Sequence, residues 1–78
     1  MTHEDYMREA MKEADKAVLD GNGPFGVVVV DNDTGEIICR DHDRVMECCD
    51  PTAHGEINAI RKLCKERESL SLANTTFY

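Results

Sequence analysis

The residues most able to do chemistry lie in one short stretch, where His54 and Glu56 are separated by a single residue. We expect a helix to begin here, because Asp50 can cap free backbone N–H groups and Pro51 fits the first helical position. Side chains in a first turn lean toward the helix N-terminus, so both groups can flank an object beyond that end. The positive field there favours a neutral imidazole, the form that binds a metal.

The longer stretch around these residues, DPTAHGEINAIR at positions 50–61, resembles the zinc-dependent nucleobase and nucleotide deaminases. Their signature is H-x-E followed by P-C-x-x-C, in which the histidine and two cysteines bind zinc and the glutamate moves protons. The resemblance implies that His54 is a zinc ligand and that Glu56 is the catalytic acid and base. Gly55 stands where the family usually has Ala or Val, and no P-C-x-x-C occurs among the 78 residues.

A simple structural role is also open to each of these two residues. His54 can be a solvent-facing residue of a first helical turn, and Glu56 can be a carboxylate that the helix dipole favours. Zinc takes four ligands, and a catalytic site draws three of them from protein. The resemblance implies one zinc site in a complete domain. Because His54 alone cannot close such a site, we expect zinc to be absent, or substoichiometric and weakly held, in this chain.

The resemblance assigns two further residues, Phe25 and Asp43, to substrate binding. Phe25 belongs to the turn GPFG at positions 23–26, which bacterial guanine deaminases share, as they share the pattern RKxC found at positions 61–64. Asp43 stands where these relatives carry an asparagine that hydrogen-bonds the base. Asparagine donates and accepts hydrogen bonds, whereas an ionised aspartate only accepts them. Either the substrate differs, therefore, or the site has decayed.

The four cysteines, at positions 39, 48, 49 and 64, form no C-x-x-C pair. The simplest interpretation is free thiols in a reducing cytosol, with the first and last in the core. Cys48 and Cys49 lie in a polar loop, where they are spectators or line the site. A makeshift soft-metal site of this pair with His42 and His54 is a less favoured alternative, since the spacing matches no common zinc pattern.

The spacing of apolar residues predicts the elements that position these groups. In chain order they are a helix at 2–20, a strand at 25–31, a turn at 32–35, a strand at 36–40, a loop at 41–49, a helix at 51–67, a link at 68–74 and the start of a strand at 75–78. The valine run at 27–30 predicts burial on both faces of a sheet. We expect Met7, Met11, Ala14 and Val18 to face the core, with Ala10 and Ala17 beside them, in preference to forming a binding surface.

The order helix, strand, strand, helix, strand resembles the beginning of the cytidine-deaminase-like fold. The expected class is therefore α/β, an incomplete three-layer α-β-α fold in which the third strand pairs beside the first. The central helix should bury Ile57, Ile60 and Cys64, with Leu63 beside them. Such domains usually run to roughly 100–150 residues. We expect residues 1–78 to form a single truncated domain that lacks the C-terminal half with P-C-x-x-C.

Composition bears on the partners of the chain. The formal net charge of −7 repels phosphate backbones. It therefore argues against a nucleic acid as partner and against a tRNA-editing deaminase as the function of this chain. A purine or pyrimidine base is the expected substrate. No apolar run is long enough to span a membrane, so we expect no membrane partner. The acidic N-terminus lacks the pattern of a signal peptide, and a cytoplasmic location is expected.

The resemblance implies hydrolytic deamination of a free nucleobase, either guanine, as in guanine deaminases, or cytosine. It implies zinc as the cofactor, and we expect this chain alone to be inactive. The alternative is a non-catalytic deaminase-like domain that acts as an assembly or interaction module, or is a stable fragment. A third strand that is only begun leaves an open sheet edge, which tends to recruit another strand. We therefore expect a homodimer or larger oligomer, or a complementing C-terminal half.

Overall fold

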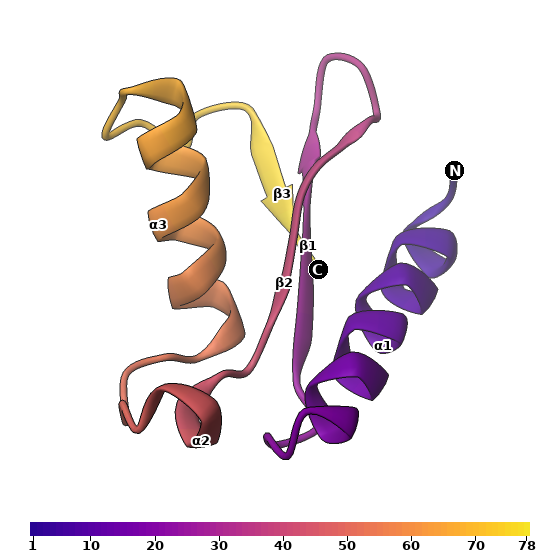
Figure 1. The fold of residues 1–78 in the computed structure, drawn as a ribbon. Helices are drawn as coiled ribbons and strands as arrows, with labels where there is room; N and C mark the ends of the chain where they lie inside the picture. The colour runs from indigo at the N-terminus through magenta and orange to yellow at the C-terminus, as the bar shows by residue number, and fades with distance from the viewer.

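Helices α1 and α3 cover opposite faces of a three-stranded sheet in the computed structural model, which describes all residues 1–78 (Figure 1). The elements are α1 at His3–Leu19, β1 at Gly26–Asp31, β2 at Ile37–His42, α2 at Val45–Cys48, α3 at Gly55–Arg67 and β3 at Thr75–Phe77. This arrangement confirms the predicted α/β class and its α-β-α layers. None of the helices has the length and apolar character that a membrane crossing requires.

Strand β1 is the centre of the sheet, with β2 on one side and β3 on the other, both antiparallel to it. The predicted hairpin and the predicted place of the third strand beside β1 are thus confirmed. Strand β2 continues further than predicted and includes Asp41 and His42. These polar residues are accommodated in the strand because their side chains have polar partners there: Arg44 donates to Asp41, and His42 contacts Glu13.

The four valines of β1 fill two separate cores. Those at positions 27 and 29 face α3, where they pack with Cys39, Ala59 and Leu63. Those at positions 28 and 30 face α1, where they pack with Tyr6 and Ala10. All four are 6% exposed or less. Because successive side chains of a strand point to opposite faces, one unbroken run serves both cores, and the predicted burial on both faces is confirmed.

Helix α1 buries Ala10 and Ala17, which were expected beside the core-facing stripe, but it does not bury the stripe itself. The stripe at positions 7, 11, 14 and 18 is largely on the surface, with Met11 62% and Val18 54% exposed, and only Ala14 is half-buried. The reason is a close approach at Gly26, where an added Cβ would lie 2.2 Å from the carbonyl oxygen of Ala10. Small side chains fit this contact better than methionines. The residues that α1 buries are Tyr6, Ala10, Glu13 and Ala17.

Helix α3 begins later than predicted, at Gly55 with His54 as its N-cap residue. Asp50 does not cap it. Its Oδ1 accepts hydrogen bonds from the backbone N–H and the hydroxyl of Thr52, at 2.8 and 2.7 Å, and so closes a local turn. Ile57 and Cys64 are only half-buried, as is Ile60. The residues that α3 buries fully are Gly55, Ala59 and Leu63.

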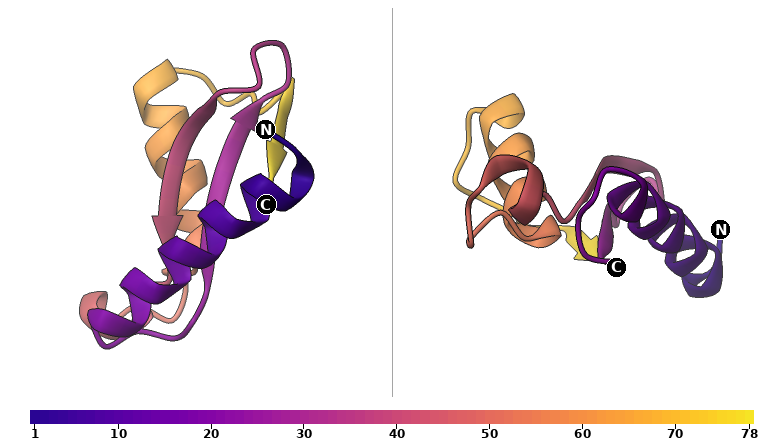
Figure 2. Two further views of the ribbon diagram at one scale, coloured as in Figure 1. Left: turned by 90° about the vertical axis from the view of Figure 1, so that its right-hand side faces the viewer. Right: turned by 60° about the horizontal axis from the view of Figure 1, so that its bottom comes forward.

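The segment predicted as a loop at 41–49 contains the short helix α2. It lies at the same end of the sheet as the C-terminal end of α1 (Figures 1 and 2). Asn22 joins the two, because its amide donates to Glu47 Oε1 at 2.9 Å while its oxygen accepts from the backbone N–H of Glu47 at 3.1 Å. At the other end of α1, His3 contacts the hydroxyl of Tyr78.

Candidate active site

His54 and Glu56 both lie at the N-terminal end of α3. His54 has an extended backbone, with φ −70° and ψ 155°, and its exposed imidazole makes no capping hydrogen bond. Glu56 is in the first turn and is also exposed. Both side chains are therefore available to a ligand beyond the helix end, where the free N–H groups and the dipole create a positive field.

The loop that carries His54 is tied to the end of β2. Ala53 is 3% exposed, and its carbonyl accepts from the backbone N–H of Arg44 at 2.9 Å and from Asn58 Nδ2 at 3.0 Å. The same Asn58 amide donates to the carbonyl of His42 at 3.0 Å. Sequence reasoning missed this clamp. The only sign of these hydrogen bonds in the sequence is an asparagine in the first turns of a helix. Asparagine has a low helix propensity, which points to another role for the residue.

Phe25 and Glu56 line one open groove of about 310 Å³ beside β1. Phe25 is 64% exposed, and Glu56 is the only charged residue in the lining. An apolar groove with an aromatic ring and one carboxylate suits a flat heterocycle with a few polar atoms. The remaining lining residues are Met7, Ala10, Met11, Ala14, Pro24, Gly26 and Tyr78.

Asp43 does not line this groove but contacts it through the backbone of Phe25, whose carbonyl accepts from the N–H of Asp43 at 2.9 Å. Asp43 is 7% exposed, and its Oδ1 accepts from the N–H of Val45 at 2.8 Å. Its Oδ2 lies beside Gly23, where an added Cβ would come within 2.8 Å of it. One carboxylate oxygen thus helps to start α2, and the other faces the turn that carries Phe25.

The charged residues at the end of β2 hold this region together. Asp41 is 4% exposed, and its carboxylate accepts from Arg44 Nε at 2.8 Å, with Lys62 Nζ at 3.5 Å. Burial raises the pKa of Asp41, but hydrogen bonds from the backbone of His42 and from Arg44 outweigh it, and the pKa is lowered overall. The hydrogen bond to Asp41 also raises the pKa of Arg44. The pair therefore stays ionised at neutral pH.

His54 fits the part of a zinc ligand, because its imidazole is exposed and makes no hydrogen bond with the protein. It is the single ligand that the H-x-E motif supplies in this chain. One group of three metal-binding side chains has its ligand atoms close together, and it contains neither His54 nor a cysteine. That group consists of Asp20, His42 and Glu47.

The makeshift soft-metal site is not assembled, since His42 is grouped with carboxylates and not with Cys48, Cys49 or His54. All four cysteines are free thiols, as the sequence suggested. Cys39 is buried, as predicted, whereas Cys64 is only half-buried. The thiols of the two cysteines at 48 and 49 are exposed at the end of α2.

The whole chain matches a known family, because the family model described as "Cytidine and deoxycytidylate deaminase zinc-binding region" covers residues 1–78. The guanine deaminase of Bacillus subtilis is 39% identical over 79 residues, which cover 100% of this chain and 49% of that protein. The tRNA-specific adenosine deaminase of Aquifex aeolicus is 36% identical over 78 residues, which cover 100% of this chain and 50% of that protein. The chain thus spans about half the length of these curated relatives.

Solved structures agree with these relationships. The X-ray structure of guanine deaminase from Bacillus subtilis has a TM-score of 0.90 at 39% identity, and the match covers 100% of this chain and 49% of that chain. A structure from a study of A-to-I editing by tRNA:A34 deaminases has a TM-score of 0.86 at 34% identity, covering 95% of this chain and 55% of that chain. Because relatives that act on tRNA are among them, these comparisons do not support the expectation that nucleic acid is excluded.

Proposed function

The chain belongs to the cytidine and deoxycytidylate deaminase zinc-binding family, and from this we propose that it contributes the H-x-E half of an active site that deaminates a free, guanine-like base. In this hydrolysis water adds to the ring carbon that bears the amine, and ammonia leaves. The observation that supports the proposal is the position of His54 and Glu56, both without protein partners at the N-terminal end of α3.

His54 and Glu56 have distinct roles in this proposal. His54 holds zinc, which supplies an activated water when it is bound. Glu56 accepts a proton from the attacking water and delivers it to the leaving amine, which requires it to lie within hydrogen-bond reach of the substrate. Its place in the groove beside Phe25 is suited to that task. The remaining zinc ligands come from a segment outside residues 1–78.

The groove and the charge of the chain favour a free base over a nucleic acid as substrate. Phe25 offers an exposed ring on which a base can stack, and the groove lining contains no Lys or Arg that would bind a phosphate. The net charge of −7 acts in the same direction. An adenosine in tRNA is the second candidate, supported by the 36% identity to the Aquifex aeolicus enzyme.

A fusion tests the proposal, with residues 1–78 replacing the matched half of Bacillus subtilis guanine deaminase. We expect ammonia release from guanine, and a loss of about 10²–10⁴-fold in kcat on Glu56→Gln, because the proton carrier is removed. Glu66→Gln is the matched control, since Glu66 is an exposed carboxylate on the same helix.

The outcomes separate the candidate functions. Activity on a tRNA anticodon stem-loop but not on guanine would favour the second candidate. A folded, zinc-loaded fusion without activity on either substrate would favour the non-catalytic alternative. Equal rates for Glu56→Gln and Glu66→Gln would contradict the role of Glu56.

A further inference from the structure

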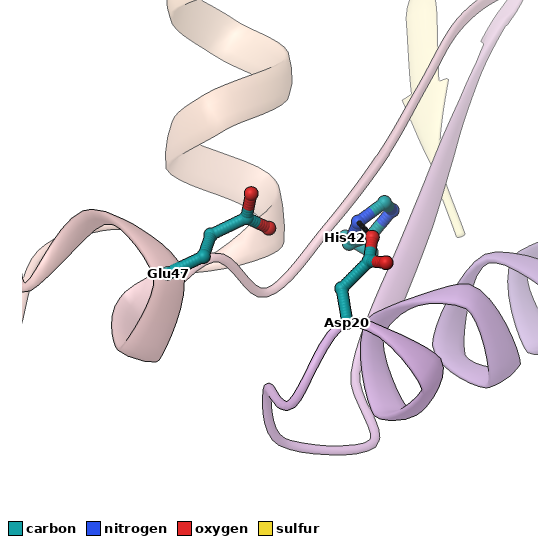
Figure 3. A group of neighbouring side chains, drawn as sticks. All are labelled: Asp20, His42 and Glu47. Carbon is teal, nitrogen blue, oxygen red and sulfur yellow. Dashed lines mark ion pairs between the residues drawn. The ribbon is translucent and has the colours of Figure 1, made fainter.

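A histidine and two carboxylates from different elements meet at the end of the sheet where α1 ends (Figure 3). Asp20 is the C-cap of α1, His42 ends β2, and Glu47 lies in α2. Their ligand atoms all lie within 4.8 Å of one another, and His42 Nε2 is 3.7 Å from Asp20 Oδ2. The side chain of His42 contacts Glu13 of α1, whereas Glu47 comes from α2, so the group bridges α1 and α2 at this end of the sheet (Figure 3).

The surroundings of His42 determine which of its nitrogens is free. The residue is only 5% exposed, and its Nδ1 lies 3.2 Å from Oε1 of Glu13, which is 4% exposed. A carboxylate only accepts hydrogen bonds, so we assign the proton of the neutral ring to Nδ1. Nε2 then carries a lone pair, and it is a buried side-chain atom with no hydrogen-bond partner. A carboxylate behind the ring is the arrangement that orients histidine ligands of metals.

The two carboxylates make this position favourable for a cation. A lone pair that faces carboxylates is repelled by them unless a positive charge lies between. Asp20 also lies at the C-terminal end of a 17-residue helix, where the dipole is negative. Oε1 of Glu47 accepts from Asn22 at 2.9 Å and from Arg44 at 3.3 Å, and this leaves Oε2 without a protein donor.

We propose that Asp20, His42 and Glu47 bind a divalent transition metal ion, for which Zn²⁺ is the best match. One imidazole nitrogen with two carboxylate oxygens is a set that zinc accepts, whereas Mg²⁺ prefers oxygen ligands only. Bonds of about 2.0–2.2 Å place the ligand atoms of a tetrahedral site roughly 3.4 Å apart. The side chains of Asp20 and Glu47 are 55% and 34% exposed, so they can make the small movement that closes the site.

The ion would join the C-terminal end of α1 to β2 and α2. Three ligands, two of them partly exposed, hold zinc weakly, so a chelator removes it and added metal restores it. This site differs in ligands and location from the one assigned to His54, and its occupancy does not depend on the proposed deaminase activity.

Calorimetric titration with ZnCl₂ tests the site, using the EDTA-treated chain with both exposed cysteines, Cys48 and Cys49, replaced by serine. We expect one equivalent of Zn²⁺ to bind, a higher melting temperature, and no competition from Mg²⁺ at the same concentration. Asp20→Asn should weaken binding at least about tenfold. Asp15→Asn, which removes the same charge from an exposed site on α1, should change it less than about twofold.

Nitrogen-15 spectra of the histidine rings identify the ligand directly. We expect Zn²⁺ to shift Nε2 of His42 and to leave Nδ1 protonated, with His3 and His54 changed much less. Shifts confined to His3 or His54 would overturn the proposal, as would equal weakening by the Asp20 and Asp15 variants. A His42 ring that stays protonated on both nitrogens and does not respond to Zn²⁺ would also overturn the proposal, because a proton and not a metal ion would then occupy Nε2.

Discussion

Asp43 presents a single free carboxylate oxygen to the turn that carries Phe25. Its Oδ1 is used by the N–H of Val45, while Oδ2 lies beside Gly23. An asparagine at this position could keep the bond to Val45 through its oxygen and turn its NH₂ group toward Phe25. The substitution therefore exchanges an acceptor for a donor and leaves the start of α2 intact.

We predict that Asp43→Asn in the fusion enzyme raises the ratio of kcat/KM for guanine over cytosine by about tenfold, because a donor replaces an acceptor beside the turn that carries Phe25 into the proposed base groove. Steady-state assays on both bases measure this ratio. Asp15→Asn, an exposed change of the same chemistry, is the control. An unchanged ratio in the Asp43 variant would count against a role of Asp43 in base recognition.

The sequence identified several of these residues but not how they are grouped. His54 and Glu56 could be found because they belong to one local motif at a helix end. The clamp formed by Asn58 could not, since it depends on carbonyls of His42 and Ala53 that only the fold brings near. The cluster of His42 with two carboxylates was missed for the same reason, because its members lie on three elements.

At the scale of elements, the backbones of α1 and β1 approach each other closely at Gly26. A Cβ at Gly26 would lie 2.2 Å from the oxygen of Ala10 and 2.4 Å from the nitrogen of Ala14. Both are backbone atoms, so no side-chain rotation relieves the clash. Gly55 differs, because a Cβ there would meet the backbone of His42 at 3.4 Å, close to ordinary van der Waals contact.

We predict that Gly26→Ala destabilises the chain by about 3 kcal/mol, since it forces α1 away from the sheet. Urea unfolding followed by circular dichroism measures the change. Gly55→Ala is the paired control and should stabilise the chain by about 0.4–1 kcal/mol, because alanine restricts the unfolded chain and fits the first turn of α3. Similar stabilities of the two variants would show that the close approach at Gly26 is not required.

Apolar spacing predicted the strands and helices well but the inner faces of the helices only in part, since Ala10, Ala17 and Leu63 are buried as expected. Hydropathy alone selects Met7 and Met11 for the core, whereas α1 instead buries Glu13 there. That carboxylate is acceptable because Lys16 and His42 contact it, at 2.9 and 3.2 Å. Such compensation is invisible in a local pattern. The start of α3 was misplaced because Asp50 stabilises a turn as readily as a helix end.

At the scale of the whole molecule, β3 forms one edge of the sheet. Val28 and Tyr78 exchange both of their backbone hydrogen bonds, at 3.2 and 2.9 Å. Because hydrogen-bonded pairs alternate along antiparallel strands, the N–H groups of Phe77 and Thr75 point away from β1. These groups can pair with a strand of another molecule. The exposed residues Met11 and Phe25 line the groove beside β1, which Tyr78 also lines directly after β3.

We predict that the chain self-associates through this edge at micromolar concentration. Light scattering should show a mass that rises with protein concentration. Hydrogen exchange at the amides of Phe77 and Thr75 should slow as the concentration rises. The amide of Thr76, which faces β1, is the internal control because its exchange should not depend on concentration. A constant monomer mass with unchanged exchange at all three amides would refute the prediction.

His42 belongs to both faces of the sheet at once. Its ring contacts Glu13 of α1 and groups with Asp20 and Glu47, while its carbonyl accepts a hydrogen bond from Asn58 of α3. If a metal draws the ring toward the carboxylates, the loop before His54 is strained or relaxed through the same residue. Any such coupling between the two faces must be reciprocal: the factor by which a ligand on one face changes affinity on the other is the same in both directions.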